Sequence, residues 1–314
     1  SISYIIGQLN GPILELVGFV QHWQDAKLSL ERLSEIHNKE DEEPLHKEHT
    51  SDIETGDIHI SNLSFKYDSL KSENVLENIN LTIPSNKITA IVGSSGSGKT
   101  TLMKLLLKFY EPVSGKIILS PVSSSISSPS GRQGGVALSS ISPKAWRDKC
   151  GSVMQEGYIF SDSIANNIAV GTDVIDKARL KYAATVANIK EFIETLPLGY
   201  NTKIGMEGIG ISSGQKQRIL IARAVYKNPE ILFFDEATNA LDANNEKIIM
   251  NNLNEVFKNK TVVIIAHRFS TVKNADQIIV IENGKIAEQG NHAELTALKG
   301  SYYELVKNQL ELGN

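Results

Sequence analysis

The segment from Gly93 to Thr100 has the residue types and the spacing of a phosphate-binding loop. It matches the pattern G-x-x-x-x-G-K-[ST] and lies between an apolar run and a segment of helical periodicity. Glycines let successive backbone N–H groups face a polyphosphate, and the N-terminus of the following helix adds its positive dipole end. Lys99 would reach the β- and γ-phosphates, and the Thr100 hydroxyl would bind Mg²⁺. The predicted nucleotide-binding residues here are Gly93, Ser94, Ser95, Gly96, Ser97, Gly98, Lys99, Thr100 and Thr101.

Two adjacent carboxylates, Asp235 and Glu236, follow the apolar run 231–234. In an open α/β sheet, ligands bind at the carboxyl ends of the strands. Asp235 would hold Mg²⁺, directly or through water, and Glu236 would polarise an attacking water as a general base. A solvated acidic pair at the end of a strand is the plain alternative, but the phosphate-binding pattern favours the catalytic interpretation.

A third pattern, Ile-Ser-Ser-Gly-Gln at residues 211–215, stands about twenty residues before the carboxylate pair. With these three motifs in this order, the sequence resembles the ATP-binding cassette (ABC) ATPases, and among them the nucleotide-binding domain of an ABC exporter. The resemblance covers residues 56–312. It implies an α/β fold with a P-loop NTPase (RecA-like) core, an antiparallel β subdomain and an inserted α-helical subdomain.

The resemblance also implies roles for single residues around the predicted site. Tyr67 matches the aromatic residue that stacks on adenine, and Gln155 matches a glutamine that reaches Mg²⁺ and the lytic water. His267 matches a histidine that contacts the γ-phosphate and holds the attacking water in register. The predicted catalytic residues are therefore Glu236, His267 and Gln155, and the predicted Mg²⁺ ligands are Thr100, Gln155 and Asp235.

The third motif is expected at the interface between two such domains, which is called the seam below. The positions that contact the γ-phosphate of ATP held by the other domain match Ser212, Ser213, Gly214 and Gln215, and Asp242 matches a residue at that seam. A helix that begins there would present free N–H groups to the phosphate. Ser213 replaces a glycine of the family motif, which would cost conformational freedom if its φ were positive. The implied partners are a second nucleotide-binding domain, as a homodimer or heterodimer, and the transmembrane domain of a full-length transporter.

Apolar patterns predict the elements that must position these residues. Alternation over residues 58–67, with a slip of register near Asn62, predicts two strand segments and a bulge. Helical spacing predicts a helix over 100–109. Asn283 and Gly284 predict a tight hairpin at the edge of a sheet. The apolar runs that alternate with helical segments, as strands of a largely parallel sheet do, are 88–92, 231–234, 262–266 and 278–281.

The N-terminal residues 1–36 repeat apolar side chains at helical spacing. This predicts an amphipathic helix, with a kink at Gly11 and Pro12. The helix either packs on the domain that follows it or forms the cytoplasmic end of the last transmembrane helix. The resemblance favours the second interpretation.

Composition divides the rest of the chain. Residues 37–55 are polar and of mixed charge, which predicts a linker before an ATPase domain over 56–314. Within that domain, residues 161–226 contain few β-branched runs and predict the helical subdomain. Residues 120–142 combine serines with proline and glycine and have neither helical nor strand periodicity, which predicts a disordered loop.

The composition of the 314-residue chain limits the classes of function. Lys and Arg number 32 against 36 Asp and Glu, so the formal net charge is −4, which disfavours a protein that coats nucleic acid. The single cysteine, Cys150, cannot form an intrachain disulfide, and there is no uninterrupted apolar run of about 18 residues. The resemblance to ABC exporters implies a location at the cytoplasmic face of the inner membrane, with this fragment soluble by itself.

The resemblance implies an ATPase that dimerises around two ATP–Mg²⁺ and thereby powers export across the bacterial inner membrane. The sequence resembles bacterial exporters of peptides or bacteriocins, which implies a cargo of that class. Lipids and drugs stay open because specificity lies in transmembrane segments. A non-transport ABC ATPase and a non-hydrolysing nucleotide-binding regulatory module are the alternatives.

Overall fold

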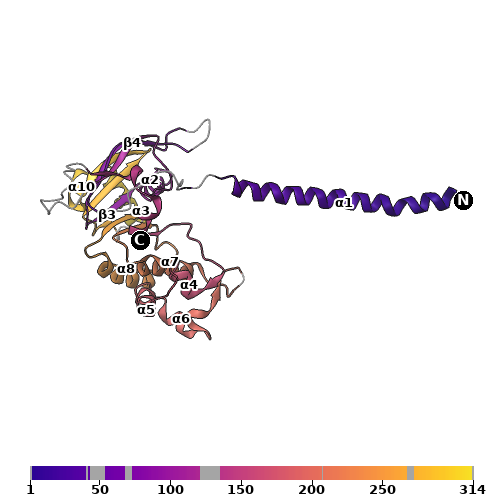
Figure 1. Ribbon diagram of the computed structural model, residues 1–314. Helices are drawn as coiled ribbons and strands as arrows, with labels where there is room; N and C mark the ends of the chain where they lie inside the picture. The colour runs from indigo at the N-terminus through magenta and orange to yellow at the C-terminus, as the bar shows by residue number, and fades with distance from the viewer. Residues whose placement is uncertain are drawn as a thin grey trace, which may run out of the picture. The chain divides into compact units, whose positions relative to one another are not determined.

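The computed structural model describes residues 2–39, 42, 54–67, 73–120, 135–206, 208–266 and 272–312. The chain divides into two units, residues 1–48 and 49–314, and each is described by itself. The first unit contains helix α1, Ile2–His37, which continues without a break through Gly11 and Pro12 (Figure 1). The predicted helix is therefore present as one element.

Apolar side chains cover more of the circumference of α1 than the predicted single stripe. Leu14 and Leu16 are 71% and 63% exposed, and two residues on a helix point about 200° apart. Glu15, His22 and Asp25 lie at helical spacing and leave a narrow polar face, so the amphipathic helix stays a prediction. No helix among the described residues is long and apolar enough to cross a bilayer.

The second unit is built on a six-stranded sheet whose strands are parallel except at one edge. The predicted hairpin forms that edge, where Asn283 and Gly284 take positive φ values of 47° and 75°, as a tight turn between two strands requires. The order across the sheet is β12 (Lys285–Gly290), β11 (Gln277–Glu282), β3 (Ile88–Val92), β10 (Thr261–Ile265), β9 (Ile231–Asp235) and β6 (Cys150–Val153).

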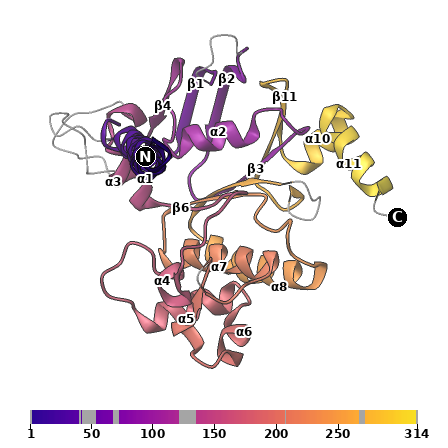
Figure 2. The same cartoon turned by 90° about the vertical axis from the view of Figure 1, so that its right-hand side faces the viewer.

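Both faces of this sheet are buried, which explains the continuous apolar runs in its strands. In β9, Leu232 and Phe234 belong to one buried cluster, while Ile231 and Phe233 belong to another. Helix α2 (Lys99–Leu106) packs in the second cluster, and helices α7 (Ser213–Tyr226) and α8 (Ala243–Phe257) pack in the first (Figure 2). Helix α2 ends three residues before the predicted boundary, because Lys108 takes a left-handed φ of 57°.

A second, antiparallel sheet of four strands packs over α2. The register of β1 against β2 shifts on both sides of Leu63, and Asn62 has a φ of 50°, as the slip in the sequence pattern predicts. The order is β2 (Leu76–Ile83), β1 (Ile58–Phe65), β4 (Ser114–Leu119) and β5 (Val136–Ala137).

The prediction of a disordered loop over 120–142 is wrong for its last part. Strand β5 pairs with β4, the short 3₁₀ helix η1 (Leu138–Ser140) follows it, and Ser142 caps helix α3 (Pro143–Lys149) by accepting from the Ala145 N–H. The two residues of β5 are too few to show a period in the sequence. Residues 121–134 lie outside the described residues.

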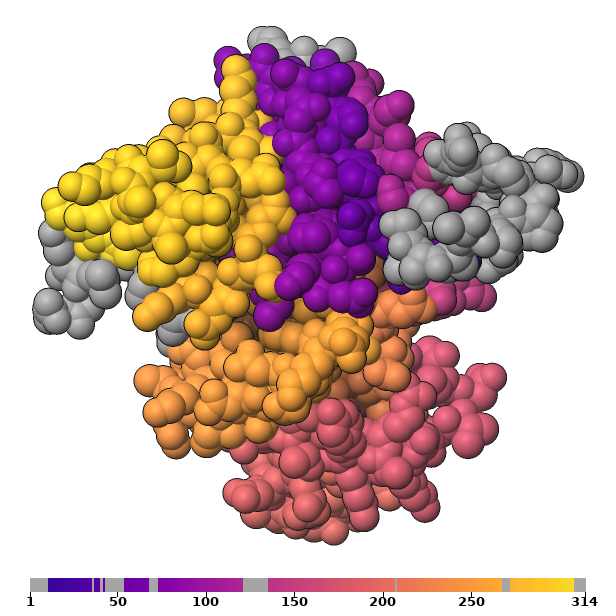
Figure 3. Space-filling view, turned by 90° about the vertical axis from the view of Figure 1, so that its left-hand side faces the viewer, coloured from indigo at the N-terminus to yellow at the C-terminus, as the bar shows by residue number. Residues whose placement is uncertain are grey.

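A helical region lies between β6 and β9 in the chain, and Figure 3 shows its pink part at the bottom of the view. It also holds a two-stranded sheet, β7 (Asp162–Ser163) with β8 (Lys203–Ile204), which the sequence analysis did not predict. The helices of this region before α7 are α4 (Ile164–Ile168), α5 (Lys177–Val186), α6 (Lys190–Thr195) and the 3₁₀ turn η2 (Gly199–Asn201). Outside this region, helices α10 (His292–Leu298) and α11 (Ser301–Leu312) follow β12.

Candidate nucleotide-binding site

The predicted phosphate loop connects β3 to α2, as its motif requires. Gly93 and Gly98 have φ values of 152° and 104°, which side-chain-bearing residues rarely adopt. A Cβ atom at Gly93 would lie 2.1 Å from the carbonyl oxygen of Ile281, and one at Gly98 would lie 2.7 Å from Cδ2 of Leu76. Both glycines are therefore required by the backbone conformation and by their neighbours.

Lys99, the first residue of α2, is only 6% exposed. Its ammonium group donates to the carbonyl oxygens of Gly93 at 3.0 Å and Ser94 at 2.7 Å. Burial lowers the pKa of Lys99, while the nearby carboxylates of Glu236 and Asp235 act in the opposite direction. The lysine is thus a buried cation at the end of the loop, and it donates to two backbone carbonyl oxygens near the start of the loop.

Asp235 ends β9 with both carboxylate oxygens buried, and neither has a hydrogen-bond partner among the described residues. Burial raises the pKa of Asp235, and the Thr100 hydroxyl opposes this without reaching full hydrogen-bond geometry. An unpaired buried carboxylate is costly unless a cation accompanies it. Carboxylate and hydroxyl oxygens suit Mg²⁺, so Asp235 and Thr100 fit the predicted metal. No group of three or more His, Cys, Asp or Glu residues in the described part of the chain forms another metal centre.

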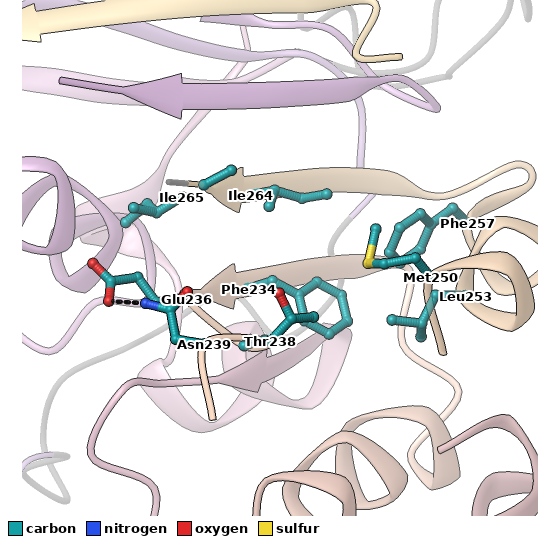
Figure 4. Close-up of a pocket in the computed structure, with 11 residues that line it drawn as sticks. Phe234, Glu236, Thr238, Asn239, Met250, Leu253, Phe257, Ile264 and Ile265 are labelled. Carbon is teal, nitrogen blue, oxygen red and sulfur yellow. Dashed lines mark hydrogen bonds between the residues drawn. The ribbon is translucent and has the colours of Figure 1, made fainter. Parts of the chain in front are cut away.

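Glu236 follows Asp235 and leaves the strand with a left-handed φ of 50°. Its N–H donates to the carbonyl oxygen of Ile265 at 3.2 Å, which ties the turn to β10. Its carboxylate oxygen Oε2 accepts from Nε2 of Gln155 at 3.4 Å and from Nδ2 of Asn239 at 2.5 Å (Figure 4). The carboxylate therefore has amide donors from two different loops.

A single pocket is lined by eight of the residues predicted for the site. Lys99, Gln155 and Glu236 come from three loops at the carboxyl ends of the strands, and all of them line it. Asn239 also lines this pocket and was missed, because nothing in its residue type distinguishes it from other asparagines in the sequence. The complete lining is Val75, Ser95, Gly96, Gly98, Lys99, Thr100, Thr101, Gln155, Glu236 and Asn239.

A second pocket, drawn in Figure 4, lies behind Glu236 between α8 and the strands β9 and β10. Phe234, Met250 and Phe257 make its wall apolar. No Lys or Arg is among the described residues that line it, so it suits a triphosphate less well than the phosphate-loop pocket does.

Tyr67 lies just after β1, next to the phosphate-loop helix. Its hydroxyl is 3.1 Å from Oγ1 of Thr101, and its ring meets those of Phe65 and Tyr110 edge to face. The half-buried ring is thus fixed near the start of α2, and its stacking on adenine stays a prediction.

The residues predicted for the seam lie at the N-terminus of α7 and before α8. Ser212 caps α7 in a capping box: its hydroxyl accepts from the Gln215 N–H, and the Gln215 side chain accepts from the Ser212 N–H. Ser213 and Gly214 are the first helical residues, so the expected conformational cost at Ser213 is absent. No residue of 212–215 is among the described residues that line the phosphate-loop pocket.

Asp242 and His267 are the two remaining predicted residues. Asp242 caps α8, and hydrogen bonds from the backbone and side chain of Asn245 lower the pKa of its carboxyl group. His267 lies outside the described residues, directly after Ala266. Its predicted role therefore stays a prediction.

Comparisons with known proteins agree with this architecture. The chain is 42% identical over 303 residues to the alpha-hemolysin translocation ATP-binding protein HlyB of Escherichia coli O157:H7, covering 96% of this chain and 41% of HlyB. It is 40% identical over 312 residues to the leukotoxin translocation ATP-binding protein LktB of Mannheimia glucosida, covering 99% of this chain and 42% of LktB. The chain thus spans less than half the length of these relatives.

The structure of a bacterial Atm1-family ABC exporter with ATP bound matches with a TM-score of 0.77 and 33% identity, over 91% of this chain and 47% of that one. The predicted P-loop NTPase fold class is thereby confirmed. The family described as ABC transporter matches residues 76–239, from β2 to the turn that carries Asn239. A match over more than half of the sequence, with a phosphate loop built as its motif requires, shows that the chain belongs to the ABC transporter family.

Proposed function

We propose that this chain is the ATP-hydrolysing nucleotide-binding domain of an ABC exporter. The observation that carries the proposal is the buried carboxylate of Asp235, which has no partner among the described residues and lies beside the phosphate loop. Lys99 and Glu236 meet at the same pocket. A buried cation, a cation-seeking carboxylate and a candidate base in one place are the requirements of metal-assisted phosphoryl transfer to water.

Each residue of the site would have its own role in the reaction. The loop N–H groups and Lys99 bind the phosphates, and Thr100, Asp235 and Gln155 would hold Mg²⁺, which offsets the charge on the β- and γ-phosphates. Glu236 accepts a proton from water as the water oxygen attacks the γ-phosphorus. The bond from that phosphorus to the bridging oxygen breaks, and ADP and phosphate leave. In this proposal His267 holds the attacking water in register.

The motif at 212–215 supports a dimer of domains. These residues cap and begin α7, away from the phosphate-loop pocket of their own chain. The N–H groups at a helix N-terminus suit a phosphate. We therefore propose that Ser213 and Gly214 contact the γ-phosphate bound by a second nucleotide-binding domain, in a homodimer or a heterodimer. Loss of that phosphate would remove a contact that only the closed dimer makes.

The relatives support a role in export. HlyB and LktB are named for the translocation of alpha-hemolysin and leukotoxin. We propose a polypeptide cargo of the peptide or bacteriocin class, a transmembrane domain in the full-length protein as partner, and a location at the cytoplasmic face of the bacterial inner membrane.

Release of phosphate from ATP–Mg²⁺ at steady state tests the proposal. The wild-type chain should turn over, and Glu236→Gln should lose about 10²-fold or more in rate, as removal of a general base does. Glu255→Gln is the matched control, because Glu255 is an exposed carboxylate on α8 that pairs with Lys258. Glu236→Gln should also accumulate an ATP-bound dimer in gel filtration.

The alternatives give different results in the same assays. Equal rates near zero in the wild type and in Glu236→Gln, with ATP still bound, would favour a regulatory module that does not turn over. A strictly monomeric Glu236→Gln protein in excess ATP–Mg²⁺ would contradict the dimer.

A further inference from the structure

We propose that Asn239 is a positioning residue for the carboxylate of Glu236; this inference rests on the proposed function, in which Glu236 is the general base. The Asn239 side chain points at Glu236, and Nδ2 lies 2.5 Å from Oε2 (Figure 4). An ionised carboxylate only accepts hydrogen bonds, so the NH₂ group of the amide must face it. Hydrogen bonds to a charged acceptor are shorter and stronger than neutral ones.

The backbone brings the two side chains together. Glu236 has a left-handed φ of 50°, which is uncommon for a residue with a side chain and persists where surrounding contacts hold it. The Asn239 N–H donates to the carbonyl oxygen of Glu236 at 3.2 Å, closing a turn. The Glu236 N–H donates to Ile265, so the turn is attached to the neighbouring strand. The first and fourth residues of such a turn lie close together, and here their side chains meet.

Contacts of the neighbouring residue Thr238 with α8 and with the following turn hold Asn239 in position. The Thr238 hydroxyl donates to Oε1 of the buried Glu246 at 3.0 Å, and the Leu241 N–H donates to the carbonyl oxygen of Thr238 at 3.0 Å. Asn239 also opens the segment 239–242, which ends with Asp242 as the cap of α8. The segment that ends at Asp242, the residue predicted at the domain seam, is thus connected to the general base through one side chain.

Gln155 is the other amide donor to Oε2, and the two contacts differ. Its Nε2 lies 3.4 Å from the oxygen and belongs to an exposed side chain on another loop. The Asn239 contact is shorter by 0.9 Å and closes within a four-residue turn. Of these two amide contacts, the structure therefore assigns the larger role in orienting Oε2 of Glu236 to Asn239.

Steady-state ATP hydrolysis by substituted chains tests this assignment. Asn239→Ala should lower kcat by about tenfold with little change in KM for ATP, because a loosened base loses part of its catalytic contribution. Asn239→Ser keeps a donor and should recover part of the rate, whereas Asn239→Asp places a second negative charge beside Glu236 and should be the slowest. Asn254→Ala is the matched control, since Asn254 is an exposed asparagine on α8.

The double variant Asn239→Ala/Glu236→Gln separates positioning from a general structural effect. If Asn239 acts through Glu236, the double variant should be no slower than Glu236→Gln alone. The proposal is overturned if Asn239→Ala keeps the wild-type kcat, if it changes only KM, or if its loss persists in full on the Glu236→Gln background. A wild-type rate in Glu236→Gln itself would instead overturn the proposed function, so the two failures are distinguishable.

Discussion

Nζ of Lys99 lies 3.0 Å from the carbonyl oxygen of Gly93, six residues earlier in the chain. This hydrogen bond joins the two ends of the phosphate loop and fixes the position of a buried cation. The same ammonium group also donates to the Ser94 carbonyl oxygen. Lys99 therefore has a role in the loop conformation as well as the proposed role in binding phosphate.

Replacement of Lys99 by alanine should remove most of the affinity for ATP. A charge-assisted hydrogen bond contributes about 1.5–3 kcal/mol, which corresponds to a loss of roughly 10- to 100-fold in affinity. Titration with a fluorescent ATP analogue measures this. Lys116→Ala, at an exposed position on β4, is the control and should bind as the wild type does. Equal affinity of Lys99→Ala and Lys116→Ala would contradict the assignment of the phosphate loop.

Asp235→Asn should stabilise the protein in the absence of Mg²⁺ while abolishing hydrolysis. Burial raises the pKa of Asp235, so the folded state holds the proton more tightly than the unfolded state does. The free energy of unfolding therefore falls as the pH rises from the ordinary carboxyl range, near 3.9, to the raised value. Asparagine has nearly the same shape and no charge, so it removes this pH-dependent cost.

Thermal unfolding in EDTA between pH 4 and pH 8 measures the effect. The melting temperature of Asp235→Asn should exceed that of the wild type at pH 8, and the difference should shrink toward pH 4. Added Mg²⁺ and ATP should stabilise the wild type and have a smaller effect on the variant. A difference that is independent of pH would mean that the carboxylate of Asp235 does not carry this cost.

Gly98→Ala should weaken both the fold and nucleotide binding. The residue has a φ of 104°, and its added Cβ would lie 2.7 Å from Cδ2 of Leu76. Left-handed conformations cost side-chain-bearing residues about 1–2 kcal/mol before any steric contact is counted. Gly210→Ala is the control, since nothing lies within 4 Å of its Cβ position. Urea unfolding should separate the two variants, and equal midpoints would argue against the strained loop.

The sequence predicts the parts of this site that depend on local pattern. An apolar run followed by Asp235 and Glu236 indicates the end of a buried strand, and a glycine-rich loop before Lys99 indicates the start of a helix. Both indications agree with the structure, because buried parallel strands direct their carboxyl ends to one edge of the sheet. Ligand loops after separate strands then meet there.

The parts that could not be predicted depend on tertiary contacts or on unusual backbone angles. The contact of Asn239 with Glu236 needs the left-handed φ of Glu236, which no feature of that residue type suggests. Strand β5 exists through its pairing with β4 rather than through a pattern of its own. At Ser213, the sequence left open whether φ is positive, and the capping box before it places the residue inside the helix.

Ser212→Ala should loosen the first turn of α7 and thereby weaken the proposed ATP-driven dimer. The Ser212 hydroxyl accepts from the Gln215 N–H at 3.2 Å, and loss of such a cap costs about 1 kcal/mol. Ser142→Ala is the matched control, because it removes the same kind of serine cap from α3. Hydrogen exchange at the Gln215 and Lys216 amides should accelerate in Ser212→Ala and stay unchanged in Ser142→Ala. On the Glu236→Gln background, gel filtration in ATP–Mg²⁺ should show less dimer with Ser212→Ala. If hydrogen exchange is faster but the amount of dimer is unchanged, the order of this turn does not contribute to the seam.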